Sequence, residues 1–347
     1  MQRPKAFLPD DVWGSPHMEQ GKLVNVEMGP KVVAFGGGHG LSATLRALRH
    51  ITHQISAVVT VADDGGSSGR IRQETPVLPP GDLRMALVSL CDNSEWSLTW
   101  RDLMQLRLDT DGPLDDHALG NLLIVGLWQM FEDPVVGLDW MGRLLDSHGR
   151  VLPMSSVPLR IEATVREGDH TKRISGQTTV AVAGADLVDL TVEPADAQVP
   201  PQTLEAVADA EWVILGPGSW FTSVIPHLLL DRLHQAIVMT PAHRALILNL
   251  TPQSGETAHL SSADLVREIS KVSPDLKIDV VIADPTTVED IDDLMEASAA
   301  LGARVLLRQV RSGTDGAVHD PLRLASALRD AFDGFLGEVG TTEAWLD

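Results

Sequence analysis

The chain has 347 residues and a formal net charge of -21, from 48 acidic and 27 basic side chains. Nucleic acid and anionic membranes would be repelled by such a surface, so we expect neither as a partner. An anionic ligand would need a local electropositive pocket. The one cysteine, Cys91, rules out an intrachain disulfide and favours a cytoplasmic setting. No apolar run is long enough to predict a membrane span.

The first organised unit is a strand, a glycine loop and a helix. Val32 to Phe35 are apolar and suit a strand buried on both faces. The chain then passes through glycines and continues with apolar residues at helical spacing up to Leu48. Residues 1–28 show no such periodicity, so we expect a loosely ordered extension there, followed by one α/β domain (29–333) and a tail (334–347).

The next stretch predicts a strand and several helices. A strand over residues 55–61 ends in a loop of small residues, and Asp82 is placed as the N-cap of a helix over 83–90. Further helices are expected over 96–108, 116–131 and 135–145. Residues 149–195 then alternate in short β-like runs, which predict an antiparallel excursion from the main sheet.

Strands and helices alternate in the rest of the chain. Strands are expected over 212–215, 245–250, 278–283 and 304–307, and helices over 219–230, 263–271, 287–300 and 321–332. This alternation predicts an α/β fold with a Rossmann-like, doubly wound and mostly parallel sheet, into which the antiparallel β segment is inserted. In such a fold the loops at the carboxyl ends of the strands converge on one crevice.

The glycine loop is the first of four candidate binding loops. Its glycines let backbone N–H groups approach an anion, and the following helix adds the positive end of its dipole. The spacing matches neither the dinucleotide Gly-x-Gly-x-x-Gly pattern nor a Walker A loop, and a tight packing turn is the alternative. The candidate binding residues are Gly36, Gly37, Gly38, His39, Gly40, Leu41 and Ser42.

The second loop follows the strand over residues 55–61. Its aspartates suit ribose hydroxyls, a Mg²⁺ ion or an Asx turn. Gly65 to Gly69 formally matches a nucleophile elbow, but Ser67 lies too far from the strand for a serine hydrolase. The candidates in this loop are Asp63, Asp64, Gly66, Ser67 and Ser68.

Two later strand ends provide the other loops. After residue 215, Ser219 either caps a helix or joins exposed N–H groups and hydroxyls in a second phosphate cradle. After residue 250, polar side chains point toward the crevice or into solvent. The candidates here are Gly216, Pro217, Gly218, Ser219, Thr222, Ser223, Gln253 and Glu256.

Some residues outside these loops also suit the site. Asp82 is a candidate cap or metal ligand, Arg84 a candidate phosphate clamp, and Asn121 a residue that could face the pocket. We interpret Asp116 as an N-cap and His117 as a surface residue. The histidines show no zinc-binding pattern.

Taken in order, these loops resemble the gluconeogenesis factor family (YvcK). The resemblance rests on the stretches Gly36 to Ser42, Val61 to Arg70, Pro80 to Arg84, Leu119 to Leu123, Gly216 to Ser219 and Gln253 to Thr257. It implies a Rossmann-like domain related to CofD, the 2-phospho-L-lactate transferase of deazaflavin cofactor synthesis. It also implies a bacterial cytoplasmic protein that binds UDP-sugars such as UDP-N-acetylglucosamine.

The resemblance implies a role in cell shape and wall synthesis during growth on gluconeogenic carbon sources. It also implies a protein partner in the control of the cell wall or of carbon metabolism. We expect a homo-oligomer. The transferase branch uses aspartates at positions matching Asp63, Asp64 and Asp82 around Mg²⁺. Carried over, this makes Asp64 and Asp82 the metal ligands, and Asp64, Asp82 and Arg84 the catalytic candidates. The chain departs from the family at His39, usually Thr, and at Pro252, where a backbone donor is lost.

Three functions remain open from the sequence. The first is a nucleotide-sugar-binding regulator, which the YvcK-like form of residues 218–226 and 119–121 favours. The second is a Mg²⁺-dependent transferase of a phospho-acyl or nucleotidyl group, for which no dedicated nucleophile is needed. The third is an NAD-dependent dehydrogenase, which the glycine spacing disfavours.

Overall fold

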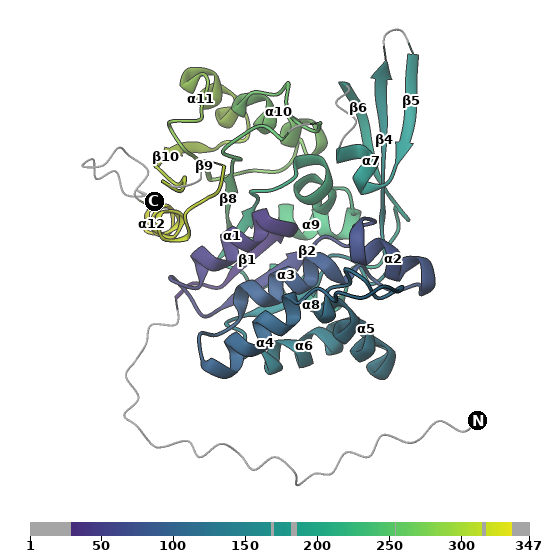
Figure 1. The fold of residues 1–347 in the computed structure, drawn as a ribbon. Helices are drawn as coiled ribbons and strands as arrows, with labels where there is room; N and C mark the ends of the chain where they lie inside the picture. The colour runs from purple at the N-terminus through teal and green to yellow at the C-terminus, as the bar shows by residue number, and fades with distance from the viewer. Residues whose placement is uncertain (1–28, 168–169, 182–185, 254, 314–316, 335–347) are drawn as a thin grey trace, which may run out of the picture.

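The computed structural model describes residues 29–167, 170–181, 186–253, 255–313 and 317–334. The extension predicted for residues 1–28 and all but the first residue of the predicted tail lie outside them. The chain forms a doubly wound α/β fold around a seven-stranded sheet of order β10-β9-β8-β7-β1-β2-β3, whose pairings are parallel. Figure 1 shows this sheet with helices packed on both faces. Its strands are β1 (Val32–Gly36), β2 (Ile55–Val59), β3 (Arg150–Pro153), β7 (Trp212–Leu215), β8 (His243–Ile247), β9 (Val280–Ala283) and β10 (Arg304–Leu307).

The helices form two groups. One group contains α1, which packs against both α3 and α12, and α5, which packs against α3, α4 and α6; the other contains the pairs α8 with α9 and α10 with α11. Their bounds are α1 (Gly38–Leu48), α2 (Gly66–Glu74), α3 (Pro80–Leu90), α4 (Glu95–Gln105), α5 (Leu119–Phe131), α6 (Pro134–Leu144), α7 (Gln177–Ala181), α8 (Pro201–Ala208), α9 (Asp231–Met239), α10 (Ser262–Val272), α11 (Ile291–Ala300) and α12 (Pro321–Phe332).

The order of the strands creates a switch point between β1 and β7. From β1 the chain moves outward through β2 to β3, and from β7 it moves outward in the opposite direction through β8 and β9 to β10. At such a point the connecting loops diverge to opposite faces of the sheet and leave a crevice beyond the carboxyl ends of the strands. The glycine loop follows β1, and Gly216 follows β7, so both lie at this crevice.

The predicted antiparallel segment forms a separate three-stranded sheet of order β5-β4-β6. Its strands are β4 (Arg160–Glu167), β5 (His170–Ser175) and β6 (Asp186–Glu193). Figure 1 shows this sheet projecting from one side of the main body. The expected start of the segment is too early, because residues 150–153 pair in parallel with β2 and form the edge of the main sheet.

Three local predictions are wrong. Residues 66–70, expected as part of a loop, belong to α2. The helix expected over 219–230 is a π-helical turn, Trp220–Val224, followed by a 3-10 turn, Ile225–Leu228. Asp82 is not an N-cap, since α3 begins at Pro80 with Pro79 in that position.

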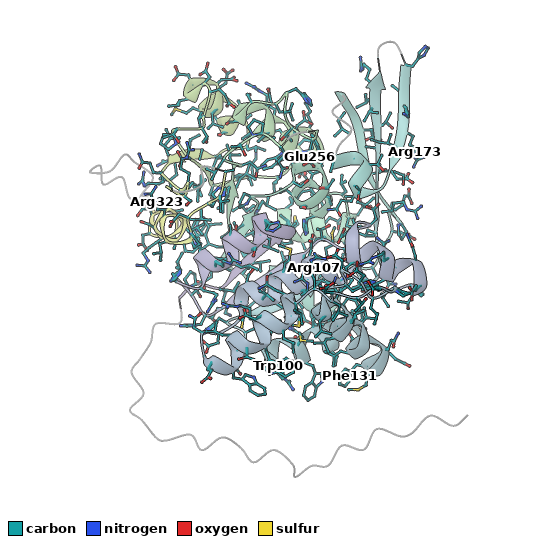
Figure 2. All side chains as sticks on the ribbon, in the orientation of Figure 1. Trp100, Arg107, Phe131, Arg173, Glu256 and Arg323 are labelled. Atoms are coloured by element: carbon teal, nitrogen blue, oxygen red, sulfur yellow. The ribbon has the colours of Figure 1, made fainter. Side chains whose placement is uncertain are left out.

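The central strands carry the core. All five residues of β1 and all four of β7 are buried, as expected for parallel strands covered on both faces. At the outer surface of the layer made by α4, α5 and α6, Figure 2 shows Trp100 and Phe131 at the edge of the molecule. Within the described residues, no helix is both long and apolar enough to cross a membrane.

Phe35 provides a test of this core. Its side chain is 0% exposed, and its ring centroid lies 5.3 Å from that of His227. Replacing Phe35 by Ala leaves a cavity between strand and helix layers, so we expect the free energy of unfolding in urea to fall by about 3–5 kcal/mol. Met239→Ala is the control, because that side chain is 80% exposed, and should change stability by less than about 0.5 kcal/mol. Equal losses in both variants would contradict this view of the core.

Candidate functional site

The glycine loop presents the start of a helix to the crevice. β1 ends at Gly36 and α1 starts at Gly38, with Gly37 as an extended N-cap that offers no side chain. Gly37 provides no capping side chain. The Asp82 carboxylate, from α3, accepts a hydrogen bond from the Gly38 amide, and the N–H groups that follow it have no partner within the helix and are suited to an anion. Gly38 has φ +53°, a left-handed conformation that glycine adopts without strain.

The loops after β1 and β7 are in direct contact. A Cβ atom on Gly40 would lie 2.2 Å from the carbonyl oxygen of Pro217 and 2.5 Å from Cα of Gly218. The Thr44 hydroxyl donates a hydrogen bond of 3.0 Å to the carbonyl of Gly216. Glycine at position 40 is therefore required by the approach of the two loops.

Asp82 and Ser223 approach this contact from two other elements. A Cβ atom on Gly37 would lie 2.5 Å from Oδ2 of Asp82 and 3.2 Å from Oγ of Ser223. Burial, together with the charge of Asp63, raises the pKa of the Asp82 carboxyl to about 7. The crevice therefore has a carboxylate directly beside the glycine loop, and this carboxylate is costly to ionise.

Asp63 and Asp64 have different surroundings. Asp63 is half-buried and accepts a hydrogen bond of 2.9 Å from the Gly65 amide, and burial raises its pKa. Asp64 is exposed and accepts bonds of 3.1 Å and 2.9 Å from the backbone amide and hydroxyl of Thr178. Asp63 is thus the acidic neighbour of Asp82, while Asp64 joins the β2 loop to the start of α7.

These positions bear on the expected metal ligands. Within the described parts of the chain, no cluster of three or more histidine, cysteine or acidic side chains could hold a metal ion alone. Mg²⁺ needs only one or two carboxylates when phosphates and water complete its shell. Asp63 with Asp82 fits that requirement better than the expected Asp64 with Asp82, because Asp64 is turned toward Thr178.

A buried polar network lies beside this pair. Asn121 donates to the Ser67 hydroxyl over 3.0 Å, and that hydroxyl lies 2.9 Å from Nδ1 of His117. Asn121 also accepts from Nε of Arg84 over 2.9 Å. Interpreting His117 as a surface residue was wrong, since it is 5% exposed, and Asp116 is not an N-cap, because α5 starts after Ala118.

Arg84 is a buried cation with no carboxylate partner. It is 9% exposed, and no acidic oxygen of the described residues forms an ion pair with it; its one side-chain partner there is Asn121. Burial and the nearby charge of Arg107 lower its pKa, and the charge of Asp82 acts in the opposite direction. Burying a guanidinium without an ion pair is costly, so an anion at this position would compensate it.

The expected second phosphate cradle is occupied by a side chain. Glu256 is 5% exposed and accepts a hydrogen bond of 2.8 Å from the Phe221 amide, and the Ser219 hydroxyl also donates to it. Ser219 in turn contacts the Thr222 hydroxyl. The N–H groups that we expected to be exposed at this turn therefore bind a carboxylate of the chain itself.

The other predicted residues lie in different surroundings. Leu41 is 1% exposed and belongs to the core, and the Ser42 hydroxyl bonds to that of Ser89, so neither faces the crevice. The Ser68 hydroxyl accepts from the Gly81 amide over 3.0 Å. Gly66 starts α2 at the exposed surface. His39 and Gln253 line a cavity beside the glycine loop.

The sequence did not single out three residues that shape the site. Asn249 holds the Gly218 backbone by two hydrogen bonds. Its side-chain oxygen accepts from the Gly218 N–H over 2.9 Å, and its side-chain nitrogen donates to the Gly218 carbonyl over 2.8 Å. Thr60 places its methyl group beside Gly37, and His319 lines the cavity. Asn249 follows β8 almost directly, so its strand-end position was the signal that could have identified it.

Gly40→Ala tests the contact between the two loops. The added methyl group overlaps Pro217 and Gly218, so we expect a loss of about 1–3 kcal/mol in the free energy of unfolding. Gly126→Ala is a matched control, because a Cβ atom there meets nothing within 4 Å in the middle of α5; it should be neutral or stabilising by up to about 1 kcal/mol. Equal stability of the two variants in urea unfolding would refute the contact.

The raised pKa of Asp82 predicts a pH dependence. Its value rises from 3.8 to about 7 on folding, so between these values the folded protein holds a proton that the unfolded chain has released. This carboxyl group therefore lowers the free energy of unfolding as the pH rises through that window. Asp82→Asn should be increasingly more stable than the original protein from about pH 4 to pH 7, with a constant difference above, when both are unfolded by urea in EDTA. A difference independent of pH would contradict the prediction.

Comparison with known proteins places these features in a family. Residues 32–305 match the family model described as "2-phospho-L-lactate transferase CofD". The "Putative gluconeogenesis factor" of Mycobacterium tuberculosis is 42% identical over 321 residues, covering 90% of this chain and 92% of that protein. The "Gluconeogenesis factor" of Bacillus subtilis is 32% identical over 315 residues, covering 87% and 98%. A crystal structure of a UPF0052 family member from Bacillus halodurans has a TM-score of 0.78 at 30% identity, covering 86% of this chain and 99% of that chain. The chain therefore belongs to the CofD-like family and, within it, to the gluconeogenesis factors.

Proposed function

We propose that this gluconeogenesis factor is a cytoplasmic regulator that binds a UDP-sugar of the UDP-N-acetylglucosamine type at the β1–β7 crevice. The observation that carries the proposal is the contact of Gly40 with Pro217 and Gly218, which sets the start of α1 against the loop after β7. Helix starts at a switch point bind diphosphates in open α/β sheets. A ligand that contacts both loops would also change the position of one loop relative to the other.

The charge distribution supports an anionic ligand. The chain carries a net charge of -21, yet Arg84 is buried near the crevice without an acidic partner among the described residues. A diphosphate would compensate this charge. We infer that Arg84 and the start of α1 hold the phosphates, opposite Gly218.

Mg²⁺ is compatible with the same site. Asp63 and Asp82 would hold the ion, which would neutralise the charge of the phosphates. Burial and, after it, the charge of Asp63 raise the pKa of Asp82, and a cation would relieve the repulsion between the two carboxylates. This pair also favours the second candidate function, a Mg²⁺-dependent transferase similar to 2-phospho-L-lactate transferase. In that case Asp63 would replace Asp64 as the first choice of metal ligand. NAD remains the least favoured ligand because of the glycine spacing.

The names of the relatives support a role in gluconeogenic growth. We propose that the ligand state controls a protein partner in cell-wall or carbon metabolism and thereby cell shape, in a homo-oligomeric protein. Thermal unfolding with UDP-N-acetylglucosamine, GTP or NAD, each with and without Mg²⁺, separates the candidates. Stabilisation by the UDP-sugar without turnover supports the regulator, whereas product formation from a guanylylated substrate supports the transferase.

Arg84→Met tests the anion site directly. Because a hydrogen bond to a charged group contributes about 1.5–3 kcal/mol, we expect the affinity for UDP-N-acetylglucosamine to fall by at least about tenfold. Stability should change little, since the cost of burying the charge and the hydrogen bond to Asn121 are lost together. Isothermal titration calorimetry and urea unfolding measure the two effects.

Arg244→Met is the matched control. Arg244 is also 9% exposed, but its guanidinium donates to the carbonyls of Ile237, Val238 and Thr240. This variant should lose stability and keep its affinity for the nucleotide sugar. If Arg84→Met instead loses stability and retains full affinity, the proposed role of Arg84 is wrong.

A further inference from the structure

The outer layer formed by α4, α5 and α6 carries four aromatic rings in two pairs. Trp96 and Trp100 lie one turn apart on α4, with their ring centroids separated by 5.7 Å. Phe131, the last residue of α5, stacks on Trp140 of α6 at a centroid distance of 5.8 Å and an interplanar angle of 4°. We call these four residues the aromatic strip. Figure 2 shows Trp100 and Phe131 at the same edge of the molecule.

A contact between α4 and α6 joins the two ring pairs. The indole N–H of Trp96 donates a hydrogen bond of 3.0 Å to the carbonyl of Leu144, at the end of α6. Leu144 lies one turn after Trp140 on the same side of that helix. The strip therefore runs from α4 over α6 to the end of α5.

Much of this strip is exposed to solvent. Trp96 is 56% exposed and Trp140 42%, which makes them the most exposed tryptophans of the described residues. Met130, next to Phe131 at the end of α5, is 66% exposed. Contiguous apolar patches of this kind mark interaction sites on soluble proteins, whereas single exposed apolar residues need no explanation.

The region has little net charge for such an acidic chain. α5 has no charged residue among its 13 positions. On α4, Arg101 pairs with Asp102 over 2.8 Å, and on α6 the Arg143 guanidinium lies 5.0 Å from the ring centre of Trp140. Two copies with a net charge of -21 each repel one another across most of their surface. An uncharged aromatic face, by contrast, is complementary to the same face of a second copy.

We propose that the aromatic strip is the interface of a symmetric dimer, in which the strips of two copies of this chain pack together. Its aromatic and charge-poor composition is that of the core of a homodimer interface. An aromatic side chain buries about 150–250 Å² when fully covered. The exposed parts of the four rings and of Met130 can therefore supply roughly half of the about 800 Å² that a stable interface takes from each partner. The proposal rests on the homo-oligomer of the proposed function and names the face by which it forms.

Sedimentation equilibrium of the whole chain tests this interface. We expect the original protein to be a dimer at micromolar concentration, and Met130→Glu, which places an unpaired charge in the contact, to raise the dissociation constant at least about tenfold. Met130→Lys should weaken the dimer as well, although it lowers the net negative charge. Met239→Glu is the matched control, because that methionine is exposed at the end of α9, in the other group of helices, and should leave the dissociation constant unchanged.

Tryptophan fluorescence provides a second measurement. Trp96 and Trp140 are covered in the proposed dimer and exposed in the monomer, so dilution of the original protein should shift the emission to longer wavelength as the dimer dissociates. The same shift should appear in Met130→Glu at higher protein concentration. Thermal unfolding of each variant confirms that it is folded before these measurements.

The outcomes separate the interface from the ligand site. A monomeric original protein means that something other than a second copy covers the strip, and overturns the proposal. An unchanged dimer in Met130→Glu, or equal weakening in Met239→Glu, also overturns it. Met130 lies at the opposite end of α5 from Asn121, so titration of Met130→Glu with UDP-N-acetylglucosamine tests the ligand proposal independently of the dimer.

Discussion

The site depends on the close contact between the loops that follow β1 and β7. Gly40 fits against Pro217 and Gly218 only because it has no side chain. Thr44, also on α1, and Asn249, after β8, hold the same loop by hydrogen bonds. The contact occurs at the one place where neighbouring strands send their connections in opposite directions. The start of α1 is therefore held at a crevice whose two walls belong to different halves of the sheet.

Charge is the second constraint. A chain with net charge -21 can bind an anion only where positive groups are concentrated and acidic groups are neutralised. The start of α1 and the buried Arg84 provide the positive groups. The raised pKa of Asp82 beside Asp63 means that this carboxylate is readily neutralised, by a proton or by a cation. At the neighbouring turn, by contrast, Glu256 already satisfies the N–H groups, so the proposed anion site lies on the side of α1.

The sequence was sufficient where local patterning determines structure. Apolar runs predicted β7 and β10 with their observed bounds, and turn glycines placed the loop after β1. Contacts between distant residues decided the rest. Adjacent Asp63 and Asp64 differ because Thr178, 114 residues further along, binds only Asp64. His117 is buried because α2 brings Ser67 to it, and α2 itself was missed because its first turn is rich in glycine, a poor helix former. His319 lines the cavity on a segment that is bridged to Arg311.

The most direct test of the account is a crystal structure of the protein with UDP-N-acetylglucosamine. The account predicts that the diphosphate oxygens lie within hydrogen-bonding distance of the backbone amides at the start of α1, opposite Gly218 and on the side of Arg84. A nucleotide sugar bound elsewhere on the molecule, with these amides and Arg84 free of the phosphates, would contradict it.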